Sequence, residues 1–198
     1  MKAPFLRSSE IRTYAAEFLK RFHNTRTVPV PIEEIIEFML GIDIIPMPGL
    51  QRTFDVEAFI SADKTEIRVD DYVYSNRQQR YRFSLAHEIG HWAMHGDLWA
   101  VLTFSSVDEW KDTVQRLPPK EYGFVEWQAH EFAGLILVPP EELLDAVNDE
   151  ISKLNVNGHS VDEFEPETLI AYISNPIARR FDVSTIVVEK RIAADKII

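Results

Sequence analysis

Residues 82–95 read Arg-Phe-Ser-Leu-Ala-His-Glu-Ile-Gly-His-Trp-Ala-Met-His, and the rest of the chain has to be arranged around this stretch. Apolar residues recur there at three- and four-residue intervals, which predicts a helix over residues 75–95 with one buried face. These residues are Tyr81, Leu85, Ile89 and Trp92. His87 and His91 are four residues apart, so their imidazoles lie on one side of the helix. The helix therefore offers two nitrogen ligands to a single ion.

The chemistry of this pattern depends on the residue between the two histidines. Neutral imidazole binds Zn²⁺ at about 2.0–2.1 Å. Glu88 is rotated about 100° from His87, so it misses direct ligation but reaches a water on the metal. The ion lowers the pKa of that water to near 7, and a neighbouring carboxylate can take its proton. The spacing indicates metal-assisted hydrolysis, with Glu88 as the general base.

A catalytic zinc site needs a third protein ligand and leaves its fourth position to water. The chain has no cysteine, so this ligand is a carboxylate or another histidine. A second predicted helix, residues 124–137, carries Glu126 and His130 on one face. Small residues on the two helices let their backbones approach closely, namely Gly90, Ala129, Ala133 and Gly134. We interpret Glu126 as the third ligand, with Glu131 and His130 as competitors; Glu131 lies about 140° from the face of Glu126.

Two further histidines have supporting roles in this interpretation. Ligating imidazoles usually donate their other N–H to a partner, so His130 is expected to orient a ligand by a hydrogen bond. His95 follows His91 by one helical turn, and as a fourth nitrogen ligand it would close the site and make it structural. It lies about 12 Å along the axis from His87, so one ion cannot easily meet both. We expect His95 to cap the helix or lie at the core edge.

Other residues near the motif leave alternatives open. The arginines that precede or begin it pair with carboxylates or contact an acidic substrate; they are Arg77, Arg80 and Arg82. Candidates for stabilising an oxyanion are Tyr81, Tyr122 and His130. The expected cofactor is Zn²⁺, although Mn²⁺ and Fe²⁺ accept similar ligands.

The rest of the chain divides at its proline and glycine residues. Helices are predicted at residues 8–22, 32–40, 141–147, 166–181 and 185–193, and strands at 42–45, 57–61 and 66–69. Residues 97–121 have no clear period, which is typical of a lid or loop, and residues 150–166 resemble a linker. The predicted fold is α+β and mostly helical, with a small, mainly antiparallel three-stranded sheet. We expect one domain over residues 1–150 and a helical extension over residues 151–198.

Composition limits the classes of function. The 198 residues are 45% hydrophobic, which suits a globular domain with a real core, and their net charge of -11 disfavours direct binding to nucleic acid. The absence of cysteine excludes a disulfide framework and a thiolate zinc finger. The first 22 residues lack the pattern of a signal peptide, and no apolar stretch is long enough for a bilayer. These features predict a cytoplasmic protein.

The motifs resemble those of the ImmA/IrrE metallopeptidases. Residues 82–91, ending in His95, resemble the signature helix of that family. Its second helix carries a Glu followed by Ala, Phe-Ala and Pro, which here are Glu126, Ala129, Phe132-Ala133 and Pro139. The strand at residues 67–69 also fits, and residues 177–184 resemble the closing helix-turn-helix-like element of the family.

The resemblance implies a zincin-like active-site helix within a gluzincin-like, thermolysin-related catalytic core. It also implies a regulatory role, in which the peptidase cleaves a helix-turn-helix repressor in stress responses or mobile elements. A second hypothesis is a zinc-containing module that binds and sequesters its partner without cleaving it. The intact Glu88 favours the enzyme. A third hypothesis, DNA binding through the terminal helices, is disfavoured by acidic residues in that segment such as Asp182, Glu189 and Asp195.

Overall fold

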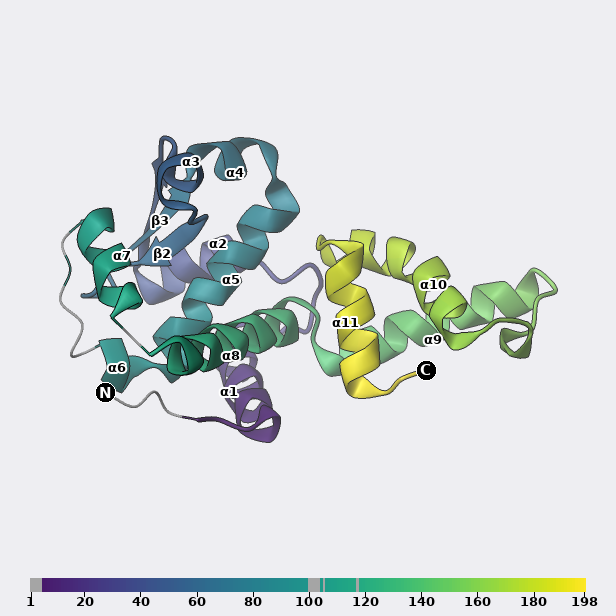
Figure 1. Ribbon diagram of the computed structural model, residues 1–198. Helices are drawn as coiled ribbons and strands as arrows, with labels where there is room; N and C mark the ends of the chain where they lie inside the picture. Colours follow the sequence, from purple (N-terminus) through teal and green to yellow (C-terminus); the bar gives the residue numbers. More distant parts are fainter. Residues whose placement is uncertain (1–4, 100–103, 105, 117) are drawn as a thin grey trace.

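Two long helices, α5 (Gln78–Met94) and α8 (Pro119–Leu137), pack against each other at the centre of the protein (Figure 1). The computed structural model describes residues 5–99, 104, 106–116 and 118–198. A small sheet lies on one side of this helix pair, and a lobe of C-terminal helices lies on the other. The architecture is the mostly helical α+β fold that the sequence predicts.

The sheet has three strands, β1 (Asp43–Met47), β2 (Ala58–Ile60) and β3 (Glu66–Asp70), in the order β1-β3-β2. The predicted number of strands is confirmed, but the sheet is mixed. Strand β2 is antiparallel to β3, whereas β1 is parallel to β3 over five residue pairs. The expectation of a mainly antiparallel sheet therefore holds only for the β2–β3 pair. The chain between β1 and β3 passes through a helix, α3 (Leu50–Phe54), and through β2, which gives it the length that a parallel return requires.

The chain enters the motif helix through a capped turn. The side chain of Asp70 accepts hydrogen bonds from the backbone N–H groups of Tyr72 (3.1 Å) and Val73 (3.2 Å), which starts helix α4 (Asp71–Asn76). Arg77 then leaves the helical conformation before α5 begins. The predicted helix over residues 75–95 is thus α5, preceded by a separate short helix.

The N-terminal helices pack against the central pair: α1 (Ser8–Phe22) contacts α8 and α5, and α2 (Ile32–Glu34) contacts α5. Helix α1 has the predicted bounds and buries Ile11, Ala15 and Phe18. The ring of Phe18 meets Phe132 of α8 edge-on, with centroids 5.7 Å apart. The second predicted helix is also present, as α2 followed by a π-helix, η1 (Ile35–Leu40). Gly41 ends it in the left-handed conformation, with φ of 67°.

Residues 97–121 are more ordered than we expected. They include α6 (Gly96–Trp99), α7 (Val107–Gln115) and the first turn of α8, which Pro119 opens. The expectation of a loop is wrong for α7 because its apolar face packs on the sheet side: Val107 and Trp110 form a small cluster with residues that include Phe59. Residues 100–103, 105 and 117 lie outside the described residues.

The C-terminal lobe consists of α9 (Pro140–Val156), a short 3-10 helix (Val161–Glu163), α10 (Pro166–Phe181) and α11 (Thr185–Asp195). The predicted helix over 141–147 continues to Val156, so the predicted linker is helical over its first residues. Arg191 of α11 is buried and donates from Nε to the carbonyl of Val138, at the end of α8 (3.4 Å). This contact ties the lobe to the central helices.

Helix α8 is most deeply buried towards its C-terminal end: residues 132–138 are all buried. Its apolar surface faces other protein elements, chiefly α5 and α1. Over the part of the chain that the structure describes, no helix combines the length and the apolar character that crossing a membrane requires.

Candidate metal centre

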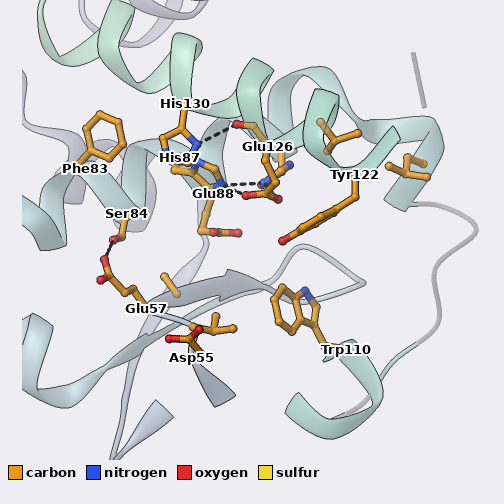
Figure 2. Close-up of a pocket in the computed structure, with 15 residues that line it drawn as sticks. Asp55, Glu57, Phe83, Ser84, His87, Glu88, Trp110, Tyr122, Glu126 and His130 are labelled. Atoms are coloured by element: carbon orange, nitrogen blue, oxygen red, sulfur yellow. Dashed lines mark hydrogen bonds and ion pairs between the residues drawn. The ribbon is translucent and has the colours of Figure 1, made fainter. Parts of the chain in front are cut away.

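Three predicted ligands from two helices converge on one point (Figure 2). The Nε2 atoms of His87 and His91 on α5 are 3.0 Å apart. Glu126 of α8 places Oε2 at 3.2 Å from Nε2 of His87 and Oε1 at 3.5 Å from Nε2 of His91. The two imidazoles and the carboxylate therefore share one small space.

These separations fit a tetrahedral metal ion. Ligand atoms bound to zinc at about 2.0–2.1 Å with tetrahedral angles are about 3.3 Å apart, close to the spacing of the three side chains. Two imidazole nitrogens and one carboxylate are a ligand set that suits Zn²⁺ and leaves one position open. The residues present therefore fit the ion that the sequence predicts.

The electrostatics of the site favour the ligand forms of two of these side chains, a neutral His91 and an ionised Glu126. Burial lowers the pKa of His91 to about 3, against the opposing effect of Glu126, so this imidazole is neutral. Burial alone would raise the pKa of Glu126, but the adjacent imidazoles of His87 and His91 hold that pKa well below the usual range. Burial likewise opposes the charged form of His87, yet Glu126 and Glu88 raise its pKa overall.

Glu88 lies beside the ligands and is 5% exposed. Its Oε2 atom accepts a hydrogen bond from the backbone N–H of Ile60 in β2, at 2.9 Å. Burial and, secondarily, the charge of Glu126 raise the pKa of Glu88 to about 8, although His87 and the Ile60 N–H act in the opposite direction. The carboxyl group of Glu88 is thus held between the motif helix and the sheet, within the same cavity as the ligands.

The structure gives His130 different neighbours from those that the sequence suggested. Its Nδ1–H donates to the backbone carbonyl of Glu126, at 2.9 Å. Its ring packs edge-on against His87, with centroids 4.5 Å apart. One nitrogen each of His87 and His130 and one oxygen of Glu126 lie within 4.8 Å of one another. His130 therefore contacts a ligand through its ring, while its Nδ1–H is used by the main chain.

His95 has a closer relation to the site than sequence reasoning gave it. It is the C-cap residue of α5, as expected, and it is fully buried. Its Nδ1 atom lies 3.0 Å from Nδ1 of His91, and its Nε2 atom lies 3.2 Å from Oε1 of Gln128 on α8. Gln128 was missed altogether, because no local pattern distinguishes a buried glutamine from an exposed one.

A cavity of about 240 Å³ opens over the three ligands and Glu88. Its walls come from the segment before β2, from α5, from α7 and from α8. Trp110 and Tyr122 line one side (Figure 2). Trp110 was not predicted, because its helix was expected to be a loop. Of the three residues considered for an oxyanion, Tyr122 and His130 line the cavity, whereas Tyr81 is buried in the core against Tyr74.

The arginines near the motif bind protein groups. Arg80 forms an ion pair with Glu57. Arg82 is buried and donates to the carbonyl of Val30 (2.8 Å) and to the carbonyl of Asp182 (3.1 Å). Arg82 also forms an ion pair with the carboxylate of Asp182, at 3.3 Å, so the interpretation of these side chains as partners of carboxylates is confirmed for both. Glu131, a competitor for the third ligand, accepts a hydrogen bond from Ser8 and is directed away from the cluster.

Comparisons with known proteins place the chain in a family. Residues 40–193 match the family Peptidase_M78, described as the IrrE N-terminal-like domain. The comparison with curated proteins gave no match. A solved structure of a Mycobacterium tuberculosis transcriptional regulator is similar in fold, with a TM-score of 0.55 and 16% sequence identity. The similarity covers 90% of this chain and 45% of that protein, so the chain spans less than half of its length. Because the family match includes α5, α8 and most of the remaining chain, this protein belongs to the Peptidase_M78 family of IrrE N-terminal-like domains.

Proposed function

We propose that this protein is a zinc-dependent metallopeptidase that hydrolyses a peptide bond with an activated water. The observation that carries the proposal is the convergence of His87, His91 and Glu126, with ligand atoms 3.0–3.5 Å apart, beside the buried Glu88. Zinc, when bound, supplies a Lewis acid that acidifies water and polarises a carbonyl. The family assignment supports hydrolysis of peptides in general.

Glu88 is the general base in this proposal. The N–H of Ile60 fixes one of its oxygens, which leaves the other to take a proton from the attacking water. The water oxygen then bonds to the substrate carbonyl carbon. Glu88 passes the proton to the amide nitrogen as the C–N bond breaks, so a carboxylic acid and an amine leave the site. A base held by a backbone N–H on a strand needs little reorganisation during these steps.

Tyr122 is our candidate for stabilising the developing charge on the carbonyl oxygen. Its side chain lines the cavity, and Figure 2 shows its hydroxyl end directed towards Glu88 and Glu126. Burial, with the nearby charges of Glu126 and Glu88, raises its pKa, so the phenol keeps its proton and can donate it in a hydrogen bond. His130 is less suited, since its Nδ1–H is already used by the main chain and burial lowers its pKa.

The substrate we propose is a helix-turn-helix repressor, which the protein would cleave at a specific site. Support comes from the resemblance of the two motifs to ImmA/IrrE peptidases and from the family match. The structural neighbour from Mycobacterium tuberculosis is named a transcriptional regulator. A cytoplasmic location belongs to the same proposal, because repressors act there. In the same scheme residues 1–150 form the metallopeptidase domain and residues 151–198 a helix-turn-helix-like extension packed on it, with the boundary inside α9.

The test is a cleavage assay with two substrates. Zinc-loaded protein is incubated with the helix-turn-helix repressor encoded nearest to its gene and with a proteome-derived peptide library, and new N-termini are identified by mass spectrometry. The Glu88→Gln variant is the control. Specific new termini with the wild type alone support the enzyme. Loss of repression in cells with both proteins, without any cleavage, would instead support a protein that sequesters its partner.

A further inference from the structure

A chain of three buried side chains runs from the metal centre into the core. His91, His95 and Gln128 are 3%, 0% and 0% exposed. Nδ1 of His91 lies 3.0 Å from Nδ1 of His95, and Nε2 of His95 lies 3.2 Å from Oε1 of Gln128. Gln128 is two residues beyond Glu126 on α8, so this chain connects the helices that supply the ligands.

Gln128, the residue farthest from the metal ligands, determines which atom donates in each of these hydrogen bonds. The amide oxygen of Gln128 can only accept, so His95 must carry its proton on Nε2. Nδ1 of His95 then has a lone pair and accepts from His91, whose proton must be on Nδ1. The 3.0 Å separation of the two Nδ1 atoms itself requires that one of them donate and the other accept. The Nε2 atom of His91 is left with its lone pair directed at His87 and Glu126.

We infer that His95 and Gln128 are positioning residues that hold the ring of His91 in the tautomer and orientation needed to bind the metal through Nε2. This inference rests on the proposed function, since it concerns the same metal centre. His87 offers a contrast: its buried Nδ1 has no hydrogen-bond partner among the described residues. The preorganisation of the site is therefore concentrated on His91.

A tautomer measurement on the metal-free protein tests the direction of the chain. The nitrogen chemical shifts of the imidazoles, from NMR spectra of ¹⁵N-labelled protein, distinguish the Nδ1–H from the Nε2–H form. In the wild type we expect His91 as the Nδ1–H tautomer and His95 as the Nε2–H tautomer. In Gln128→Met, which keeps the side-chain length but has no strong acceptor, both rings should become mixtures. A purely structural role for Gln128 would leave the tautomers unchanged.

Zinc affinity, measured by competition with a chromophoric chelator, tests the consequence. Gln128→Met and His95→Phe should each weaken zinc binding by about 10–100-fold, the usual effect of removing a partner of a metal ligand. Gln128→Glu, which also can only accept from His95, should bind zinc at least as tightly as the wild type. Met94→Leu is the matched control. It changes a buried side chain next to His95 in the sequence but none of the three hydrogen-bonded residues, so its zinc affinity should be unchanged.

The outcomes separate the two proposals. Wild-type zinc affinity in both Gln128→Met and His95→Phe would overturn the positioning role while leaving the metallopeptidase intact. If Gln128→Glu bound zinc as weakly as Gln128→Met, the loss of zinc affinity would be due to packing, and this result would also overturn the positioning role. Failure of the wild type to bind zinc would remove the proposed function itself. Circular dichroism of the metal-free variants shows which of them fold. Where only one of the two loss variants folds, wild-type zinc affinity in that variant overturns the role.

Discussion

Gly90 of α5 lies directly against the backbone of Ala129 in α8. A Cβ atom at position 90 would be 3.0 Å from Cα and 3.2 Å from the carbonyl oxygen of Ala129. Both are backbone atoms, so no change of rotamer could relieve the contact. The absence of a side chain at Gly90 therefore sets the distance between the helix that carries His91 and the helix that carries Glu126.

Substituting Gly90→Ala should weaken both the fold and the metal centre. The added methyl group forces α5 and α8 apart, at a cost of about 1–3 kcal/mol in unfolding free energy. Because the ligand atoms belong to both helices, zinc affinity should fall by about tenfold or more. Gly123→Ala is a matched control on α8, since a Cβ there meets nothing within 4 Å. Chemical denaturation and chelator competition on both variants check this, and an unaffected Gly90→Ala site would show that the helices are not held by this contact.

Removal of the third ligand should empty the site. The Glu126→Ala variant is expected to lose zinc, because two imidazoles alone leave the ion without a charged ligand. Elemental analysis of purified protein should give about one zinc per chain for the wild type and almost none for the variant. Glu131→Ala is the control. It removes a carboxylate on the same helix whose hydrogen-bond partner is Ser8, and this variant should keep its zinc. Full zinc occupancy in Glu126→Ala would assign the third ligand elsewhere, with His130 the nearest alternative.

Glu88→Gln should separate metal binding from catalysis. The amide oxygen of glutamine can still accept from the Ile60 N–H, so the fold and the zinc content should be kept. The amide cannot take a proton, so the rate of cleavage should fall by about 10²–10⁴-fold. Assays at matched zinc occupancy check this. Cleavage at the wild-type rate would mean that another group is the base.

The same variant makes a prediction about pH in the metal-free protein. The pKa of Glu88 is about 8 in the folded protein, raised from 4.5 chiefly by burial. Between these values the folded state holds a proton that the unfolded chain has released, so the unfolding free energy falls as pH rises. This stabilisation is complete below pH 4.5 and lost above pH 8. We therefore compare the unfolding free energy of the wild type with that of Glu88→Gln. The wild-type value minus the variant value should decrease by a few kcal/mol between pH 4.5 and pH 8, on the order of 1.4 kcal/mol for each unit by which the pKa is raised. Urea denaturation of both proteins in chelator at several pH values measures it, and a difference that does not vary with pH would contradict the raised pKa.

Tyr122→Phe tests the group proposed to stabilise the oxyanion. Loss of one such donor typically lowers the rate by about 10²–10³-fold. Zinc content and substrate binding should change little, since the aromatic ring still lines the cavity. His130→Gln provides the comparison, and we expect it to have the smaller effect on kcat. The reverse order of effects in steady-state kinetics would transfer the role to His130.

The sequence-based predictions were accurate where an element depends on residues close to it in the sequence, and wrong where it depends on residues far away in the sequence. Helices α1, α10 and the motif helix were predicted closely because their apolar spacing is local. Helix α7 was missed because its apolar residues pack on α3 and β2, more than 45 residues earlier in the chain. The parallel pairing of β1 with β3 was missed for the same reason, since it depends on the path of the intervening chain.

The sequence by itself determined the chemistry of the motif. Helical periodicity puts His87 and His91 on one face and Glu88 beside them wherever the helix lies, and the residue types restrict the ion that they suit. Only the tertiary structure decided how the centre is completed. The packing of α8 brings Glu126 and Gln128 to the histidines, and strand β2 brings the Ile60 N–H to Glu88. These partners are 28 to 39 residues away in the chain, as in the pairs Ile60–Glu88 and His87–Glu126, so no local period relates them. They meet because burial of the apolar faces of α5, α8 and the sheet fixes their positions together.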